Sequence, residues 1–241
     1  MAPALCDALY WQRDRAIFRP MCGRYTQLYT WAEVYAFLNL INQPMNLRPV
    51  YNVCPTDPVD VVMSNRELRK MRWGLVPTRW NKPLKELKLA TFNARSETVD
   101  SKPFFKTAFK TKRCLLPMSG YYEWQTTGKE KQPWYFTAAN GGLLIAAGLW
   151  DEWKNRETGE TLLSCTMLIT EPNNFVAKVH DRMPVLLTPD KLEAWVEGDD
   201  KALLKPAPKG LLKRRAVSKR VNSSKADKDD ATLIEEEKLL L

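Results

Sequence analysis

Features that mark several common protein classes are missing or scarce in this chain of 241 residues. No apolar run approaches the roughly 20 residues that cross a bilayer, so we expect no contact with membranes. The five cysteines are odd in number and form no C-x-x-C pair, so their spacing predicts neither a disulfide framework nor a zinc site. We find no internal repeat and no low-complexity tract, and we expect no cofactor.

Residues 1–20 lack the basic-then-apolar order of a secretory signal, because charged residues are scattered among the apolar ones. We therefore expect a cytoplasmic protein with mostly reduced cysteines, associated with the nucleoid if it is bacterial. The length suits one well-filled core or at most two small domains.

The charge is unevenly distributed along the chain. The formal net charge is +9, and residues 21–221 hold +11, whereas residues 1–20 hold +1 and residues 222–241 hold −3. A basic body with an acidic tail favours a polyanionic partner, of which nucleic acid is the commonest. A basic surface that only aids solubility explains the charge equally well.

Short apolar runs separated by turn signals predict seven strands. Helical patterns are fewer: a capping box at residues 30–33 opens a helix to about residue 40, and a Thr-Pro pair at 188–189 opens another to about residue 196. We also expect short helices over residues 172–179 and 104–110. The predicted strands cover residues 59–63, 68–73, 114–117, 134–137, 143–150, 162–170 and 183–187.

Strands dominate without a strict βαβ rhythm. This pattern predicts an α+β fold, a single domain with a strongly bent, barrel-like β-sheet core and a few flanking helices. We expect residues 1–20 to be an N-terminal extension, residues 21–222 to be the folded domain, and residues 223–241 to be a charged, solvated and partly helical tail.

The segment Met21-Cys22-Gly23 offers a nucleophile. Removal of an initiator methionine is normal before a small residue, and it would leave Cys22 with a free α-amine beside its thiol. The ordinary pKa values of these groups, near ~8 and ~8.5, make both partly reactive at neutral pH. Together they condense with an aldehyde to a Schiff base and then to a five-membered thiazolidine. An ordinary internal Cys in a turn before a strand is the alternative.

Residues 92–98 place an amide and a guanidinium close together in sequence. Asn93 can orient a nucleophile or a bound sugar by hydrogen bonds, and the planar fork of Arg95 suits a phosphate. The alternative is a turn in which Ser96 and Thr98 cap a helix.

Two residues could carry protons. Glu123 stands between aromatics at the end of an apolar strand, where partial desolvation would raise its pKa. His180 is the only histidine, and it lies between a helix and a strand with Asp181 and Arg182 after it. The alternatives are a strand Glu paired with a Lys and a structural His.

Taken together and in this order, these segments resemble the SRAP family, the SOS response-associated peptidase domain proteins, also known as abasic-site processing proteins. The resemblance spans about 200 residues. It rests on the strings MCGRY at 21–25, YNVCPT at 51–56, MRWGLVPTRW at 71–80, FNARSET at 92–98, RCLLPMSGYYEW at 113–124, KQPW at 131–134, VHDRMPVLL at 179–187 and AVSKRVN at 216–222.

The resemblance implies a DNA damage response enzyme in which the Cys after the initiator Met attacks the ring-opened aldehyde of an abasic site. The product is a thiazolidine DNA–protein crosslink, and abasic-site lyase and autoproteolytic peptidase activities accompany this chemistry. By position, Cys22 matches the nucleophile, and Asn93 matches the Asn beside it and the deoxyribose. Glu123 matches the Glu that handles protons during Schiff-base formation, and His180 matches the His linked to sugar-ring opening and crosslink reversal.

The resemblance also implies, as partners of this chain, single-stranded DNA with abasic sites and junctions with a recessed 3′ end; we expect a monomer. Trp80 matches an aromatic used against bases or the duplex end, although Arg79 stands where family members often carry a second aromatic. Core packing is the alternative for this Trp. The predicted DNA contacts are Arg24, Asn52, Trp80, Arg95, Lys102 and Arg182.

The residues ahead of Met21 depart from the family pattern, because a Cys22 whose nitrogen is acylated cannot form a thiazolidine. Three explanations remain open: synthesis starts at Met21, which we favour; the extension is removed by self-cleavage; or the protein binds DNA without crosslinking. Three functions accordingly compete. They are a covalent DNA-lesion enzyme, a thiol peptidase with Cys22 and His180 as nucleophile and base, and a non-catalytic single-strand binder.

Overall fold

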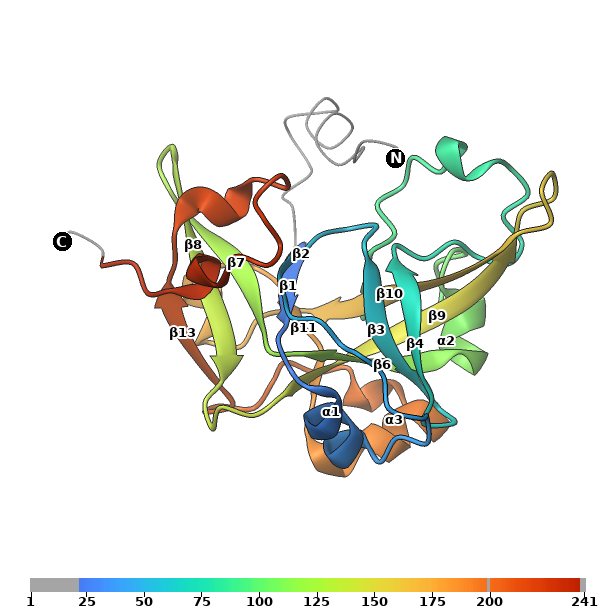
Figure 1. Cartoon of the computed structure of the whole chain (residues 1–241), viewed down its shortest axis with the longest axis horizontal. Helices are drawn as coiled ribbons and strands as arrows, with labels where there is room; N and C mark the ends of the chain where they lie inside the picture. Colours follow the sequence, from blue (N-terminus) through green and yellow to red (C-terminus); the bar gives the residue numbers. More distant parts are fainter. Residues whose placement is uncertain (1–21, 199, 239–241) are drawn as a thin grey trace.

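Five strands close into a barrel in the order β10-β4-β3-β6-β9, and β9 pairs back with β10 (Figure 1). The computed structural model describes residues 22–198 and 200–238, so the predicted extension at residues 1–20 lies outside the described part. β4 runs parallel to β10, and the other neighbours are antiparallel. The barrel strands are β3 (Pro58–Met63), β4 (Leu68–Trp73), β6 (Arg113–Met118), β9 (Leu144–Lys154) and β10 (Thr161–Thr170).

A second, antiparallel sheet has the order β13-β8-β7-β1-β2. The chain passes from the barrel into this sheet at Ser119, which alone separates β6 from β7. Its strands are β1 (Arg24–Gln27), β2 (Val50–Val53), β7 (Gly120–Thr127), β8 (Glu130–Ala138) and β13 (Leu212–Ala216). Three short strands extend the barrel sheet: β5 (Asn93–Arg95) and β11 (Met183–Pro184) pair with β10, and β12 (Leu186–Leu187) pairs with β9.

Helices are short and lie outside the sheets (Figure 1). The predicted capping box is confirmed, since the Thr30 hydroxyl accepts from the Glu33 amide at 3.2 Å and the Glu33 carboxylate accepts from the Thr30 amide at 2.7 Å. The α-helices are α1 (Trp31–Leu38), α2 (Lys106–Thr111) and α3 (Leu192–Glu197). The 3₁₀ helices are η1 (Leu84–Glu86), η2 (Val176–Lys178), η3 (Pro189–Lys191), η4 (Lys201–Leu203), η5 (Lys219–Asn222) and η6 (Ala231–Ile234). Among the described residues, no helix is long and apolar enough to cross a membrane.

The strands with long apolar runs form the barrel because both of their faces are covered. Every residue of β6 is buried, as are most residues of β9 and β10. Gly120, at the start of β7, permits a close approach of β8, since a Cβ there would lie 2.5 Å from the carbonyl oxygen of Phe136. The predicted class, α+β with a barrel-like core in a single domain, is confirmed.

Two predicted features differ from the structure. The helix expected over residues 172–179 is wrong except for η2, because the side chain of Asn173 accepts from the amides of Phe175 and Val176 and starts only one short turn. The tail is not wholly solvated. Leu233 is fully buried, and Ile234 packs against a small cluster of Tyr122, Tyr135, Val217 and Val221, so residues 228–236 pack onto the second sheet.

Candidate functional site

The pairing of β1 with β7 brings Cys22 and Glu123 together across 101 residues of sequence. Arg24 of β1 lies opposite Tyr122 of β7, so the residues just before β1 face the middle of β7. The backbone nitrogen of Cys22 donates a hydrogen bond to Oε1 of Glu123 at 2.7 Å. Both residues are buried, with exposed fractions of 2% and 0%. A thiol, a backbone nitrogen and a carboxyl group therefore share one enclosed space.

Burial dominates the protonation chemistry of Glu123. It raises the pKa of this carboxyl from the ordinary 4.5 to about 7, although the nearby His180 opposes the rise. Oε2 accepts no hydrogen bond within the described part of the chain and lies 3.8 Å from Nδ1 of His180. A carboxyl with this pKa exchanges protons readily at neutral pH, as a general acid and base must.

The ring of His180 is held by its own loop. Nδ1 accepts a hydrogen bond from the Arg182 amide at 3.1 Å and lies 3.3 Å from the carboxylate of Asp181. The bond from the Arg182 amide favours the neutral tautomer with the proton on Nε2, whereas the Arg182 carbonyl oxygen, 3.4 Å from Nδ1, favours the other tautomer. Protonation would turn Nδ1 into a donor toward the carboxylates of Asp181 and Glu123.

Asn93 reaches Cys22 from the other side. β5 runs parallel to β10, with Asn93 opposite Met167, and this pairing fixes the start of β5 beside the end of β1. Nδ2 of Asn93 donates to the carbonyl oxygen of Cys22 at 3.3 Å. The side-chain amide of Asn93 thus binds the carbonyl oxygen of Cys22, while Glu123 binds its backbone nitrogen.

Cys22 itself has two unusual properties. Its φ is 40°, in the left-handed region that non-glycine residues rarely adopt. Burial raises the pKa of its thiol well above the ordinary 9.0, and the neighbouring Glu123 raises it further. The thiol is therefore protonated in this closed arrangement, and any reaction at sulfur needs a base close by.

The four residues that the sequence singled out for catalysis, Cys22, Asn93, Glu123 and His180, thus lie together in the structure. The six residues predicted to contact DNA are arranged less uniformly. Two of them face inward, one lies on an anchored loop, and three surround the end of β5.

Arg24 and Asn52 are engaged with the protein itself. Asn52 is fully buried, and its side-chain oxygen Oδ1 accepts a hydrogen bond from Nη1 of Arg24 at 3.0 Å. The guanidinium of Arg24 also donates to the backbone carbonyls of Val221, Asn222 and Ser223. Direct DNA contact by either residue stays a prediction, and the visible role of the pair is to bind residues 221–223 to β1.

Trp80 lies on a loop that β9 anchors. The hydroxyl and amide of Thr78 donate to the carboxylate of Asp151 at 2.5 and 2.9 Å, and the indole of Trp153 donates to the carbonyl of Trp80 at 2.7 Å. The Trp80 ring lies 6.0 Å from the ring of Phe104, between centroids. The loop is fixed, and Trp80 is half-buried against one neighbour.

The three remaining residues lie near the end of β5: Arg95 is its last residue, Lys102 follows in sequence, and Arg182 contacts Glu97 just after the strand. Arg95 and Lys102 are exposed. Arg182 is paired with the carboxylate of Glu97, whose charge it neutralises in this structure. Sequence reasoning did not assign a role to Glu97 or to Asp151. Glu97 stands inside the FNARSET string and was detectable there, whereas Asp151 carried no local signal.

Comparison with known proteins gives a consistent assignment. The family model for SOS response associated peptidase (SRAP) matches residues 21–224. The chain is 35% identical over 223 residues to the abasic site processing protein YoaM of Bacillus subtilis (strain 168), covering 85% of this chain and 94% of that protein. It is 35% identical over 181 residues to the abasic site processing protein HMCES of Xenopus tropicalis, covering 62% of this chain and 54% of that protein.

Solved structures share the fold. A protein from Bacteroides thetaiotaomicron superposes with a TM-score of 0.83 at 24% sequence identity, over 90% of this chain and all of that one. A protein from Bordetella bronchiseptica superposes with a TM-score of 0.72 at 26% identity, over 82% of this chain and 100% of that one.

Proposed function

The chain belongs to the SOS response associated peptidase (SRAP) family, and we propose that it processes abasic sites in single-stranded DNA by capturing them covalently on Cys22. The relatives YoaM and HMCES are named abasic site processing proteins, which supports DNA with abasic sites as the substrate. The finer proposal is the chemistry: a thiazolidine formed between the sugar aldehyde and both nucleophiles of an N-terminal Cys22.

One observation carries this proposal: the nitrogen of Cys22 lies 2.7 Å from Oε1 of Glu123. In a chain that begins at Cys22 this nitrogen is the α-amine, with an ordinary pKa near ~8. Burial raises the pKa of Glu123 to about 7 while the Cys22 nitrogen is acylated, and an ammonium at this distance would lower it. The carboxylate can therefore accept a proton from the amine across this contact. The carboxyl is thus positioned to act on the first nucleophile.

The reaction then proceeds with Glu123 as a proton carrier. The amine attacks C1′ of the ring-opened sugar and forms a carbinolamine, and protonated Glu123 gives its proton to the departing hydroxyl, which leaves as water. The resulting iminium is attacked at the same carbon by Sγ, whose proton passes to the Glu123 carboxylate. Glu123 ends as it began, and the net products are a thiazolidine and one water.

Asn93 and His180 have supporting roles in this scheme. Asn93 fixes the Cys22 carbonyl and so orients the amine and the thiol toward one carbon. His180 lies 3.8 Å from Glu123 with Nε2–H available in one of its neutral tautomers, and it exchanges a proton with the sugar ring oxygen during ring opening. The iminium intermediate also permits β-elimination, which is the origin of the proposed lyase activity.

The DNA strand is held around the lesion by two exposed cations, by Arg182, which is half-buried and paired with Glu97 in the free protein, and by one aromatic. Arg95, Lys102 and Arg182 surround the end of β5 next to Asn93, and they bind phosphates. Trp80 stacks on a base, a contact worth roughly 1–3 kcal/mol that tolerates any sequence. A sensor of a missing base requires this indifference to sequence.

A second candidate function is the removal of residues ahead of Cys22 by the protein itself. The strained φ of 40° at Cys22 and the carboxyl on its nitrogen favour it. Sγ gives its proton to Glu123 and attacks the preceding carbonyl carbon, and the C–N bond breaks as Glu123 passes this proton to the nitrogen. Water then hydrolyses the thioester. One water is consumed, and Cys22 is released with a free amine.

Mass spectrometry of protein expressed from Met1 tests self-cleavage and decides which chain is used to test capture. Self-cleavage predicts a product starting at Cys22 that is lost in Glu123→Gln. If wild-type protein keeps its N-terminal residues, self-cleavage is excluded, and capture is then tested with a chain produced to begin at Cys22.

A further inference from the structure

Three lysines form a stripe along the segment that leads into and through α2. Lys102, Lys106 and Lys110 are spaced by four residues. The amide of Lys106 donates to the carbonyl of Lys102 at 3.0 Å, so a helical turn joins Lys102 to α2. Residues four apart on a helix lie on one face, and all three lysines are exposed.

The opposite side of α2 faces the core. Ala108 and Phe109 are buried, with exposed fractions of 2% and 6%, and Phe109 packs against Trp195. The helix is therefore fixed in orientation, and the lysine stripe cannot turn inward.

Carboxylates of the described part of the chain do not neutralise the charge of this stripe. In the part of the chain that the structure describes, none of the three forms an ion pair. Several other lysines do form ion pairs: Lys70 with Asp60, Lys112 with Asp151, Lys201 with Asp100, Lys219 with Glu130 and Lys228 with Asp57. The stripe thus keeps its full positive charge for an external anion.

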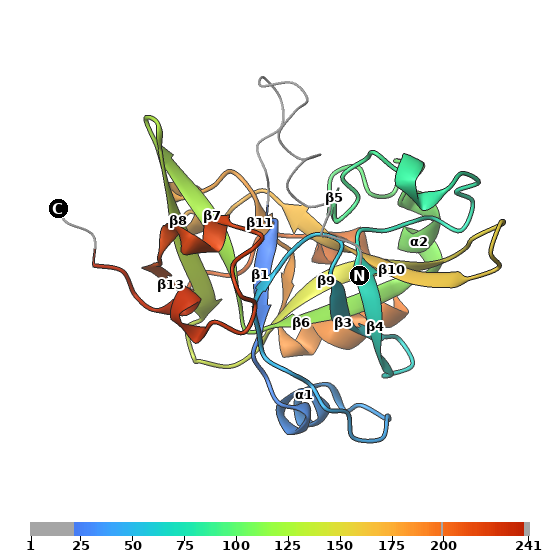
Figure 2. The ribbon, with the colours of Figure 1, turned by 45° about the horizontal axis from the view of Figure 1, so that its top comes forward.

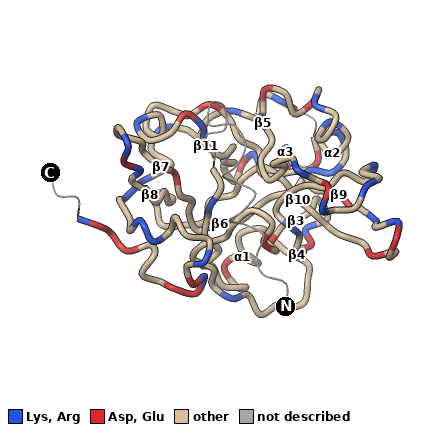
Figure 3. The backbone as a smooth tube through the Cα atoms, turned by 90° about the horizontal axis from the view of Figure 1, so that it is seen from above, with Lys and Arg blue, Asp and Glu red and all other residues tan. Residues whose placement is uncertain are grey.

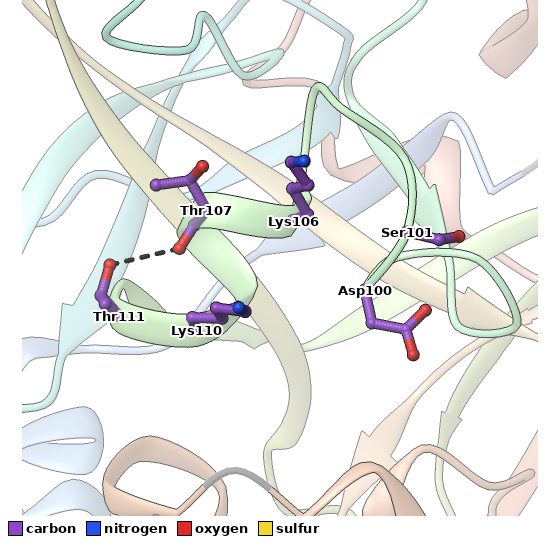
Figure 4. A pocket seen from close by; sticks show the side chains of 6 residues that line it. All are labelled: Asp100, Ser101, Lys106, Thr107, Lys110 and Thr111. Carbon is purple, nitrogen blue, oxygen red and sulfur yellow. Dashed lines mark hydrogen bonds between the residues drawn. The ribbon is translucent and has the colours of Figure 1, made fainter.

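A shallow cavity of about 400 Å³ lies along the stripe, lined by Asp100, Ser101, Lys106, Thr107, Lys110 and Thr111. Figure 4 shows Lys106 and Lys110 on the helix, across from Asp100 and Ser101 of the preceding turn. The carboxylate of Asp100 is neutralised by Lys201 at 2.7 Å, which lowers its pKa. The remaining polar groups of the lining are two ammoniums and three hydroxyls, of which those of Ser101 and Thr111 donate to the backbone carbonyls of Thr98 and Thr107. The ammoniums are therefore the main donors for phosphate oxygens.

The stripe continues the proposed DNA site. Asn93 contacts Cys22, and Lys102 follows nine residues later. The hydrogen bonds from Thr98 to Arg95 and from Lys102 to Thr98 wind this segment tightly, so the stripe starts near Arg95. Figure 2 shows β5 and α2 on the same side of the molecule.

We propose that the stripe of Lys102, Lys106 and Lys110 binds the phosphate backbone of the DNA strand that flanks the captured site. Eight residues of helix span about 12 Å. In the stacked form that a strand has in a duplex, one charge follows about every 3.4 Å of axis, so the stripe matches roughly three to four phosphates of a strand in that form. The inference rests on the proposed function, because its ligand is the strand held at Cys22.

Equilibrium binding of an undamaged single strand tests the proposal without any covalent step. The double variant Lys106→Ala/Lys110→Ala is compared with Lys209→Ala/Lys213→Ala, which removes the same charge from exposed positions at and before β13. Between about 50 and about 200 mM salt, we expect the slope of log affinity against log salt to fall in magnitude by about 1.4 in the first variant only, since each phosphate contact to a single strand contributes about 0.7. Equal slopes in both double variants would overturn the proposal.

Two further measurements locate the contact and separate it from the catalytic proposal. The difference between wild type and Lys106→Ala/Lys110→Ala should vanish on strands shortened to a few nucleotides, and Lys106→Arg/Lys110→Arg should bind as wild type. A difference that persists on the shortest strands contradicts the proposal. If the slope changes but no adduct forms, the lysine stripe is supported and the covalent function is contradicted. If the adduct forms but the slopes are unchanged, the covalent function is supported and the lysine stripe is contradicted.

Discussion

The backbone nitrogen of Cys22 and the Oε1 atom of Glu123 lie 2.7 Å apart, inside the protein and 101 residues apart in sequence. This contact joins a nucleophile to the group that can carry its protons. The neighbouring amide of Asn93 and ring of His180 complete the set. The predictions below follow from these contacts and from the charges around them.

Glu123→Gln should change how stability depends on pH. The pKa of Glu123 is about 7 in the folded protein and close to 4.5 in the unfolded chain. Because the folded pKa is the higher one, the folded state binds the proton more tightly. Protonated Glu123 contributes its full stabilisation below about pH 4.5. As pH rises to about 7 this contribution is lost, and the free energy of unfolding falls by about 3 kcal/mol. Denaturant titrations should show this loss in wild type and not in Glu123→Gln.

Glu130→Gln is the matched control for that experiment. Glu130 is exposed on the β7–β8 hairpin and paired with Lys219, so its removal should leave the pH profile between 4.5 and 7 unchanged. If Glu123→Gln keeps the wild-type profile, the carboxyl does not titrate as described. Glu123→Gln should also slow adduct formation by about 10²–10⁴-fold, the usual contribution of a positioned acid or base.

Asn93→Ala should slow capture without preventing it. The variant loses one hydrogen bond to the Cys22 carbonyl, worth about 0.5–1.5 kcal/mol, so a two- to tenfold slower single-turnover rate is expected. Asn140→Ala, in an exposed turn, is the control. An unchanged rate in Asn93→Ala would show that the amide does not orient the nucleophile.

Asn52→Ala separates a positioning role from DNA contact. The buried amide bonds Arg24 and the carbonyl of Ser223, so its loss should lower stability by about 1–3 kcal/mol and make residues 221–223 more accessible to proteases. Thermal melting and limited proteolysis measure both effects. A variant with wild-type stability but weaker DNA binding would instead favour direct contact with DNA.

Glu97→Gln should strengthen DNA binding. Glu97 neutralises Arg182 in the free protein, and removing its charge leaves the guanidinium available to a phosphate. We expect tighter binding and a salt slope steeper by about one, measured by fluorescence anisotropy. Glu157→Gln, in the exposed β9–β10 turn, should bind as wild type. Weaker binding by Glu97→Gln would mean that the ion pair holds Arg182 in its working position.

The sequence predicted the strands that have both faces covered, because their apolar runs are long and continuous. β1 and β13 were missed because RYTQ and LKRRA are mostly polar, although Thr26 and Gln27 of β1 are buried and hydrogen-bonded in the structure. Residue chemistry was enough to select Cys22, Glu123 and His180, but not their distances, which depend on the long-range pairing of β1 with β7. The packing of the tail was missed for the same reason: the hydrophobic partners of Ile234 include Tyr122 and Tyr135, which lie on the distant strands β7 and β8.

Mass spectrometry of the adduct tests the central claim most directly. A chain that begins at Cys22, incubated with a single strand containing one abasic site, should give a heat-stable adduct whose mass is the sum of both molecules minus one water. Cys22→Ser should give no heat-stable adduct, and neither should a chain whose Cys22 nitrogen remains acylated. A heat-stable adduct with Cys22→Ser, of a mass equal to that variant plus the strand minus one water, or no adduct with the chain beginning at Cys22, would contradict capture on this residue.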